Sequence, residues 1–439
     1  MSPDTPARTR EVVLVSYAYP PSSSPGAVRV TRLLARLPAL GWRCSVVTVG
    51  QAVALRSSGA ADPLAGDPSR LLRVDDPLAV VAGKAAVSRA PGERSLLRRM
   101  AEHLIFPDRT ILWALKLRKA RPWARKIAPQ IVHSTSPALS AHIAAMGIAR
   151  ATGAKWVAES RDPASWLARE DKTPAMKRWL LARLEALIVA RADATVVVSE
   201  AFAEYFRSRY PGRPIHSIPN GAEFDAKVLE AAKQSRRDRQ ASAASRPFVL
   251  VHAGELYGGA RNPAPLIAAA KRAQALTERP IVLRFIGADS AIAGSAAQTL
   301  DATHLVDVVG PMSHAQSVQE MSNADAVVAL LHDDPLGRIG IMSKFFDYAA
   351  TANPVLVVGE RVAMLSRIVE ENGMGRACEY ADIDGMATWI ADLARQPHIF
   401  DYDCVDVCRR WSADAMAASL AKLFDVLVPG GGAPPGHAA

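Results

Sequence analysis

The sequence predicts an α/β protein built from two doubly wound, Rossmann-like domains. Apolar runs at 12–16 and 248–253 are each followed by a loop rich in small residues and then by a helical pattern. Further apolar runs alternate with helical patterns after each of them, which is typical of parallel strands covered by helices on both faces. The chain of 439 residues is also longer than one ordinary core requires. We therefore expect two such domains in succession.

The first domain is expected to span residues 1–225. Apolar runs predict its strands at 12–16, 44–49, 131–133, 155–159, 194–198 and 215–218. Helical periodicity predicts its helices at 29–40, 139–152 and 177–191. Residues 51–92 are rich in Ala, Gly, Ser and Pro, so we expect an irregular insertion there. The polar segment 226–246 is expected to be the linker that follows this domain.

The second domain is expected to span residues 247–410. Its strands are predicted at 248–253, 281–286, 306–309, 326–331 and 355–358. Its helices are predicted at 263–276, 313–322, 362–371 and 383–395. A terminal amphipathic helix within 411–428 is expected to cross back to the first domain, and 429–439 to form a flexible tail.

Composition and charge narrow the classes of protein and partner. Hydrophobic residues make up 49% and charged residues 22%, which is typical of a globular protein. The net charge of +10 favours anionic partners such as nucleotide phosphates or an anionic membrane surface. We expect no nucleic-acid partner, because no basic motif with interleaved aromatic residues is present. Four cysteines without CxxC spacing argue against zinc and for a reducing cytoplasm. Neither a signal peptide nor a membrane-spanning helix is predicted.

The segment 94–126 is strongly basic. It carries ten basic and two acidic residues, a local net charge of +8, with leucines and other apolar residues interleaved. An apolar helix face rimmed by Arg and Lys is suited to an anionic bilayer surface. A solvated basic face on a core helix explains the pattern equally well, so both interpretations stay open.

Several polar residues of the first domain follow predicted strands directly. His133 ends one strand, and Arg161 and Asp162 follow the next. The carboxyl ends of the strands are where a doubly wound sheet keeps its active site. An ion pair that pins a loop, and a structural histidine, are the alternatives. Gly26 lies in the first predicted loop and would let a ligand approach the backbone, unless that loop is a plain turn.

Two segments of the second domain are suited to bind phosphate. Gly258, Gly259 and Arg261 precede a predicted helix and could cradle a diphosphate. The segment 337–358 predicts a glycine-containing loop, an amphipathic helix and a buried strand. The polar face of this helix comprises Lys344, Asp347, Tyr348 and Thr351. In one interpretation this face binds a phosphate and a sugar hydroxyl, and in the other it is only solvated.

Seven segments follow one another along the chain: Ser16 to Arg29 (SYAYPP…GAVR), Phe106 to Trp113 (FPDR…W), Ile131 to Pro137 (IVHSTSP), Glu159 to Pro163 (ESRDP), Ile218 to Gly221 (IPNG), Gly254 to Pro263 (GELYGGARNP) and Ser343 to Leu356 (SKFFDYAATANPVL). In this order they resemble segments of bacterial family-4-type glycosyltransferases, which have the GT-B fold. The resemblance spans nearly the whole chain except 51–92 and the tail. It implies two Rossmann-like domains facing a cleft.

The resemblance also implies roles for individual residues. The loop at Gly26, together with Arg261 and Lys344, would contact the donor diphosphate. Asp347 stands where the family has the second glutamate of a pair, which holds the donor ribose. The first glutamate of that pair would fall on Ile339, so that acidic residue is missing here.

A further departure concerns the loop after the first strand of the second domain. The family has Gly-Arg-Leu there, and this chain has Gly254-Glu255-Leu256, so Gly254 is retained in donor binding while one phosphate-binding Arg is absent.

The resemblance implies a cytoplasmic, membrane-peripheral glycosyltransferase that moves a sugar from a nucleotide-sugar donor to a lipid-linked or polysaccharide-precursor acceptor, with retention. Arg161, Asp162 and His133 would line the acceptor side, with Asp162 as a candidate base. We expect no metal or other cofactor, because Asp333-Asp334 is the only DxD-like pair and is interpreted as a solvated turn. A UDP-sugar 2-epimerase on the same fold and a degenerate nucleotide-sugar-binding subunit remain the alternatives.

Overall fold

The computed structural model of the chain describes residues 10–22, 24–50, 62–78, 105–170, 173–332, 344–397 and 402–429. The chain divides into two compact units, residues 1–221 with 413–439, and residues 222–412. Each unit contains one parallel sheet with helices packed against it. The predicted fold class of two Rossmann-like α/β domains is therefore confirmed.

The first unit is organised around a seven-stranded sheet, counted over the described residues, in the order β3-β2-β1-β4-β5-β6-β7. Every neighbouring pair in it is parallel. The sheet reverses its winding direction between β1 and β4, which is the switch point where doubly wound folds bind ligands. The strands are β1 (Arg10–Ser16), β2 (Trp42–Val49), β3 (Leu71–Val74), β4 (Ile131–Thr135), β5 (Lys155–Ser160), β6 (Ala194–Val197) and β7 (Ile215–Ser217).

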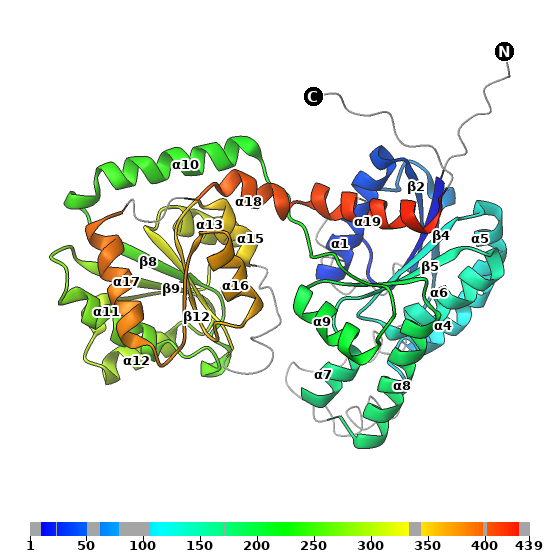
Figure 1. Cartoon of the computed structure of the whole chain (residues 1–439), viewed down its shortest axis with the longest axis horizontal. Coiled ribbons are helices and arrows are strands. Elements are labelled where there is room, and N and C mark those ends of the chain that lie inside the picture. Colours follow the sequence, from blue (N-terminus) through cyan, green and yellow to red (C-terminus); the bar gives the residue numbers. More distant parts are fainter. Residues whose placement is uncertain are drawn as a thin grey trace, which may run out of the picture. The chain divides into compact units, whose positions relative to one another are not determined.

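Helices cover both faces of this sheet (Figure 1), with α1 and α19 over one face and α4, α5 and α6 over the other. Each face buries its own apolar core, so the strands are apolar on both sides. The described α-helices are α1 (Pro25–Arg36), α4 (Ile111–Lys116), α5 (Arg121–Ile127), α6 (Leu139–Thr152), α7 (Ala164–Glu170), α8 (Ala175–Arg191), α9 (Glu200–Arg209) and α19 (Ala413–Leu427).

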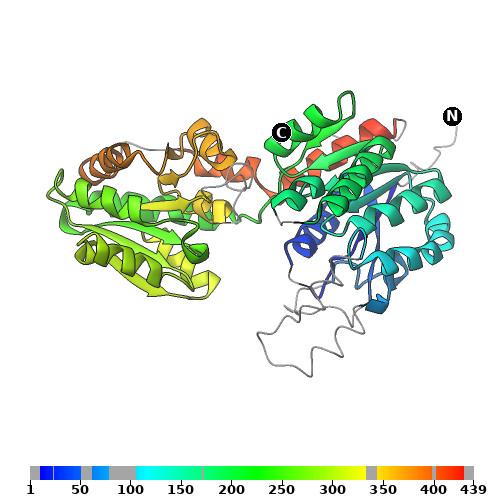
Figure 2. The ribbon, with the colours of Figure 1, turned by 90° about the horizontal axis from the view of Figure 1, so that it is seen from below.

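The C-terminal helix α19 belongs to the first unit although it follows the whole second unit in sequence (Figure 1 and Figure 2). Its Leu420 and Phe424 are fully buried in the core that α1 also covers. The Phe424 ring packs edge-on against Trp42, with ring centroids 5.2 Å apart. The Asp425 carboxylate accepts hydrogen bonds from the Trp42 indole at 3.0 Å and from Arg10. Apolar and polar contacts thus fix this helix on the first unit.

The second unit repeats the same winding with a six-stranded parallel sheet, again over the described residues, in the order β10-β9-β8-β11-β12-β13. Its switch point lies between β8 and β11. The strands are β8 (Phe248–Ala253), β9 (Ile281–Ile286), β10 (Val306–Gly310), β11 (Ala326–Leu330), β12 (Val355–Val358) and β13 (Gly375–Cys378).

Figure 1 shows α11, α12 and α17 on one side of this sheet and α13, α15 and α16 on the other. The described α-helices are α10 (Ala226–Ala241), α11 (Ala264–Gln274), α12 (Ala291–Thr299), α13 (His314–Ser322), α15 (Lys344–Ala350), α16 (Met364–Glu371), α17 (Ile383–Arg395) and α18 (Cys404–Arg410). In these helices and those of the first unit, no described segment is both long and apolar enough to cross a membrane.

Three local expectations differ from the structure. Part of the expected irregular insertion, Leu71–Val74, is strand β3 and pairs with β2. The expected linker 226–246 contains the helix α10, whose Leu229 and Arg236 are buried. Tyr348 and Thr351, expected on the polar face of their helix, are 0% and 1% exposed because the core covers that side too.

Candidate functional site

A buried carboxylate, Glu159, lies at the switch point of the first unit. It is the last residue but one of β5 and stands in register with Thr135 on β4, whose hydroxyl donates to Oε1 at 2.6 Å. Arg29 on α1 donates from Nε to Glu159 Oε2 at 3.0 Å and forms an ion pair with it at 2.9 Å through Nη2. The two side chains are 2% and 0% exposed. They therefore form a desolvated ion pair with further hydrogen-bonding partners.

Arg29 also ties α1 to the chain after β7. Its guanidinium donates to the carbonyls of Ile218 and Pro219 at 3.0 and 2.9 Å and to the Asn220 side chain at 3.1 Å. All of its polar capacity is thus used within the protein. Burial by itself raises the pKa of Glu159, but Arg29 and His133 outweigh that effect and hold the pKa well below its usual value. This pair is ionised and structural.

His133, predicted to line the acceptor side, is buried. Its side chain is 0% exposed, and Nε2 lies 3.5 Å from Glu159 Oε2. Neither ring nitrogen has a hydrogen-bond partner within the described residues. The ring packs edge-on against Phe424 at 5.9 Å. His133 can therefore influence a ligand only through Glu159, because it does not reach the surface.

The structure brings Gly26 and Arg161 together. Gly26 lies in the first turn of α1 rather than in the preceding loop, because Pro25 begins the helix and the Ser24 side chain caps it. A Cβ at Gly26 would lie 3.1 Å from Arg161 Nη1 and 3.2 Å from the Ala18 side chain. The close approach that this glycine permits is thus made by an arginine of the protein.

Arg161 and Asp162 follow β5 and lie at the predicted edge. The Arg161 backbone N–H donates to Ser136 Oγ at 2.8 Å, and its Nε is buried without a hydrogen-bond partner among the described residues. Burial lowers the pKa of Arg161, and the Glu159 charge opposes that shift. Asp162 is exposed, yet desolvation by the surrounding protein raises the pKa of its carboxyl. The charge of Arg161 opposes that shift. These two residues offer an unsatisfied cation and an accessible carboxyl side by side.

In the second unit, β8 is followed directly by Gly254, whose φ of +156° is one that residues with side chains rarely adopt. A Cβ there would lie 3.8 Å from both Arg261 Nη1 and His252 Nε2. Gly287, after β9, is needed for a related reason, since a Cβ would lie 2.2 Å from the Gly254 carbonyl oxygen. Glycines therefore keep the carboxyl edge of β8 open between Arg261 and His252.

The loop Tyr257–Gly259 does not present free amides for a diphosphate. The Asp289 carboxylate accepts from the Leu256 N–H at 2.8 Å and from the Gly258 N–H at 3.2 Å. The Gly259 N–H donates back to the Leu256 carbonyl at 3.0 Å. The predicted backbone cradle is thus filled by the protein's own groups, and of the three predicted residues Arg261 is the one left for anion binding.

Arg261 is placed by stacking and by one backbone contact. Its guanidinium carbon lies 4.6 Å from the centroid of the Tyr257 ring, and Nη1 donates to the Glu255 carbonyl at 3.2 Å. Its Nε is buried and has no hydrogen-bond partner in the described part of the chain. A partly buried guanidinium with spare donors is suited to bind a phosphate oxygen.

His252, which the sequence patterns did not single out, lies beneath this arginine. Its Nδ1 lies 3.0 Å from the Val328 carbonyl and must carry the hydrogen, because a carbonyl only accepts. Burial, assisted by the charges of Arg261 and Lys344, lowers the pKa of His252 to about 4. The ring is therefore neutral at pH 7, and its unpartnered Nε2 is an acceptor for a ligand hydroxyl.

Lys344 and Asp347 form an ion pair on α15, as expected from their spacing. Nζ of Lys344 lies 3.4 Å from the carboxylate and also 3.4 Å from Ser317 Oγ. His314 Nε2, from α13, lies 3.1 Å from the same carboxylate. The Lys344 and Asp347 side chains are 23% and 19% exposed, so a ligand can reach both. His314 is a partner that sequence reasoning missed, because it lies 33 residues away.

Several predicted positions fall outside the described residues. They are Ile339 and the other residues of 333–343, which include Asp333 and Asp334, and the first part of the basic segment, 94–104. Within the described ranges, no three His, Cys, Asp or Glu side chains cluster as metal ligands would. The expectation of metal-independent chemistry stays a prediction.

Residues 26–221 match the sequence profile of the family described as Glycosyl transferase 4-like domain. The first unit carries a glycosyl transferase 4-like domain. Gly26, His133, Arg161 and Asp162 all lie within this glycosyl transferase 4-like domain, as do Arg29 and Glu159. No curated protein has significant sequence similarity to the chain.

The whole chain has the fold of several solved glycosyltransferase structures. Sucrose-phosphate synthase from Thermosynechococcus elongatus is 16% identical with a TM-score of 0.61, over 95% of this chain and 99% of that one. HepE from Anabaena in complex with UDP is 13% identical with a TM-score of 0.58, over 95% and 100%. The lipopolysaccharide outer core galactosyltransferase WaaB is 12% identical with a TM-score of 0.58, over 95% and 100%. The glycosyl transferase 4-like domain on this GT-B fold indicates a glycosyltransferase enzyme.

Proposed function

We propose that this enzyme moves a sugar from a nucleotide-sugar donor to a glycan or lipid-linked acceptor, with retention of anomeric configuration. The observation that carries the donor part is the group formed by Arg261, Lys344 and Asp347 at the switch-point edge of the second sheet. Two cations and one carboxylate there match a diphosphate and a pair of ribose hydroxyls. HepE, which shares the fold, was solved in complex with UDP, so a uridine nucleotide is the first donor to test.

The reaction breaks the bond between the anomeric carbon and the diphosphate oxygen. Negative charge builds on the departing diphosphate, and Arg261 and Lys344 stabilise that charge as it forms. The acceptor oxygen bonds to the anomeric carbon on the face that the diphosphate leaves, and the acceptor proton passes to a leaving phosphate oxygen. Neither step requires a metal ion.

The acceptor side of the proposal rests on Arg161 and Asp162 in the first unit. Arg161 has an unsatisfied Nε, and the exposed Asp162 carboxyl has a raised pKa, which suits a group that orients the acceptor hydroxyl by a hydrogen bond while its proton passes to the leaving phosphate. His133 is buried, so we assign it a positioning role through Glu159. A lipid-linked saccharide acceptor agrees with the lipopolysaccharide outer core named for WaaB.

We also propose a cytoplasmic, membrane-peripheral location. Within 105–126 the chain carries seven basic residues and one acidic residue, and Leu112 and Leu115 are 39% and 46% exposed. Exposed leucines among cations favour binding to an anionic bilayer. In a flotation assay, the protein should float with phosphatidylglycerol vesicles and not with phosphatidylcholine vesicles. Absence of flotation at low salt would remove the membrane claim.

The test of the enzymatic proposal is a panel of UDP-, GDP- and dTDP-sugars incubated with the protein in the presence of EDTA. We expect slow hydrolysis of one donor class, and faster release of its nucleotide when a lipid-linked saccharide is added. Formation of an epimer would instead support the 2-epimerase, and binding without turnover the degenerate subunit. Absence of binding by every nucleotide sugar would contradict all three.

A further inference from the structure

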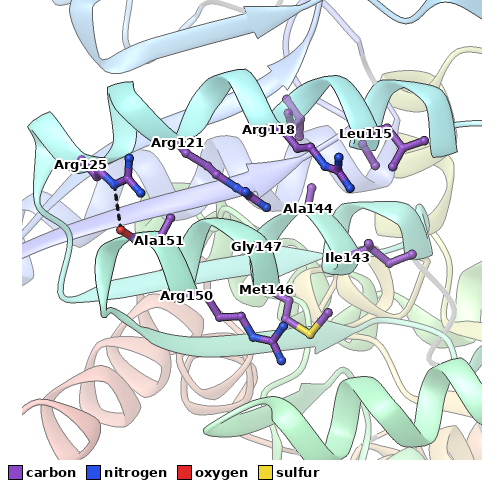
Figure 3. A pocket seen from close by; sticks show the side chains of 12 residues that line it. Leu115, Arg118, Arg121, Arg125, Ile143, Ala144, Met146, Gly147, Arg150 and Ala151 are labelled. Carbon is purple, nitrogen blue, oxygen red and sulfur yellow. Dashed lines mark hydrogen bonds between the residues drawn. The ribbon is translucent and has the colours of Figure 1, made fainter.

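A basic groove lies between two helical segments of the first unit, and one of its walls belongs to the basic stretch 105–126. Its volume is about 420 Å³, and α4, the 3-10 turn Leu117–Ala120 and α5 form one wall while α6 forms the other. Figure 3 shows Arg118, Arg121 and Arg125 projecting from the first wall toward α6, whereas the Arg150 side chain of α6 extends away from that wall. The other lining residues are Ala114, Leu115, Leu117, Ile143, Ala144, Met146, Gly147 and Ala151.

The arginines of this groove have no acidic partner among the described residues. Arg125 donates from Nε to the Ala151 carbonyl at 3.1 Å, the dashed contact in Figure 3. For Arg118, Arg121 and Arg150, the described part of the chain provides neither a carboxylate nor any hydrogen-bond acceptor. The guanidinium groups of Arg118, Arg121 and Arg125, which project from one wall, repel one another, and a bound anion would reduce that repulsion.

The wall opposite the arginines is built to let them approach. Gly147 is the residue of α6 that faces Arg121, and a Cβ there would lie 2.9 Å from Arg121 Nη2. Ala144 and Ala151, one turn away on either side, are also small. The Arg121 guanidinium can therefore lie against the α6 backbone, with its charge directed along the groove rather than out into solvent.

One end of the groove is apolar. Leu115 and Ile143 lie together at the end opposite Arg125 and Ala151, and Arg118 lies beside them (Figure 3). Leu115 is 46% exposed, so apolar surface remains open there. A ligand that fills the groove thus meets guanidinium groups along most of its length and apolar side chains at one end.

We propose that this groove binds a phosphate ester, with its phosphate oxygens on Arg118 and Arg121 and its organic part toward Leu115 and Ile143. Guanidinium groups bind phosphate through paired donors, and several of them together favour a dianion over a carboxylate. The volume suits one small ligand or headgroup. This site is separate from the proposed donor site in the second unit and does not depend on glycosyl transfer.

The phosphate ester could be soluble or could be the headgroup of a membrane lipid, and two probes separate these sources. Monomeric decyl phosphate reports a soluble ligand, and phosphatidylglycerol vesicles report a headgroup. Binding of decyl phosphate is measured by calorimetry in a Lys344→Gln background, which weakens the proposed donor site. The same measurement is repeated with Arg118→Gln/Arg121→Gln. The control, Lys119→Gln/Lys126→Gln, removes the same charge from the same helical segment but outside the groove lining.

We expect the arginine variant to weaken binding of decyl phosphate, of vesicles or of both at least tenfold, and the lysine control to weaken it less than twofold. Gly147→Ala, which displaces Arg121, should weaken it severalfold while the denaturation midpoint shows that the fold is kept. Equal losses in the arginine and lysine variants would show a diffuse basic surface and overturn the proposal. If neither decyl phosphate nor the vesicles bind saturably, the proposal is overturned too. Neither of these outcomes bears on donor hydrolysis.

Discussion

Glu159 and Asp347 are both carboxylates near the carboxyl edge of a parallel sheet, and each pairs with a cation. Glu159 is 0% exposed, and its partner Arg29 donates its remaining hydrogen bonds to the chain after β7. Asp347 is 19% exposed, and its partners Lys344 and His314 are themselves partly or largely exposed. The same kind of side chain, on strand β5 in one unit and on helix α15 in the other, therefore has different roles. The first holds the fold together, and the second remains available to a ligand.

The difference teaches that an acid–base pair near a switch point is not by itself a binding site. What distinguishes the two is whether the partners are already saturated by the protein and whether solvent reaches them. The following predictions test that distinction, beginning with the largest expected effect.

Glu159→Gln should lower the free energy of unfolding of the first unit by about 3–5 kcal/mol, because it leaves the buried Arg29 charge without its counter-ion. Urea denaturation measures the change. The matched variant Asp347→Asn should cost less than about 1 kcal/mol, because its ion pairs are partly exposed. Similar losses in the two variants would break the comparison.

Acidification should destabilise both units, because each contains a buried histidine whose pKa folding lowers to about 4. Burial lowers the pKa of His142 and of His252 to about 4. Between that pH and about 6.5 the unfolded chain binds the proton and the folded chain does not, so stability falls as the pH falls. Each histidine should cost about 2 kcal/mol on going from pH 7 to pH 5.

Hydrogen exchange at pH 7 and pH 5 resolves this pH effect unit by unit. His142→Gln should flatten the pH dependence of the first unit only, and His252→Gln that of the second only. A pH dependence that neither variant changes would show that other groups cause it. Glu159 should add to the loss of stability of the first unit only below the pKa that this carboxyl has in the unfolded chain, because folding lowers its pKa.

Asp347→Ala should weaken binding of the donor nucleotide about tenfold or more, because a charge-assisted hydrogen bond to a ribose hydroxyl is lost. Titration calorimetry with the nucleotide identified by the donor panel measures it. Glu371→Ala is the control, since that exposed carboxylate also pairs with a cation one helical turn away, Arg367. Unchanged affinity in Asp347→Ala would remove this residue from the donor site.

Gly254→Ala should have a small effect on stability, about 1 kcal/mol, because alanine is strained at a φ of +156°. It should also weaken donor binding, since its Cβ would narrow the space between Arg261 and His252. Gly26→Ala, which has no such backbone strain, should instead displace Arg161 and leave donor affinity unchanged. A reversed pattern would exchange the roles assigned to the two units.

Much of the fold follows from local sequence patterns, whereas partners that are distant in sequence do not. Runs such as 12–16 and 355–358 are apolar on both faces and read directly as buried strands. Strand β3 was not predicted, because Leu71–Val74 lies in a stretch dominated by Ala, Gly, Ser and Pro. Helix α10 was not predicted, because it buries few apolar side chains and its apolar residues therefore show only weak helical periodicity.

The candidate site was predicted only in part for the same reason. Four site residues could be predicted from the sequence because they follow strands or glycine loops within a few residues, namely Arg161, Arg261, Lys344 and Asp347. The contact of Asp289 with the Leu256 amide spans 33 residues and depends on how β8 and β9 pair, so no local pattern contains it. The position of His252 near the end of its strand, before Gly254, is a local signal that could have identified this residue.

The central claim, that Arg261 and Lys344 hold the donor diphosphate, is tested most directly by titrating UDP into the protein in the presence of EDTA. Arg261→Gln and Lys344→Gln should each weaken binding about tenfold, and the exposed control Arg367→Gln should bind as the unaltered protein does. UDP affinity that is unchanged in both site variants, or binding that requires a divalent cation, would contradict the account.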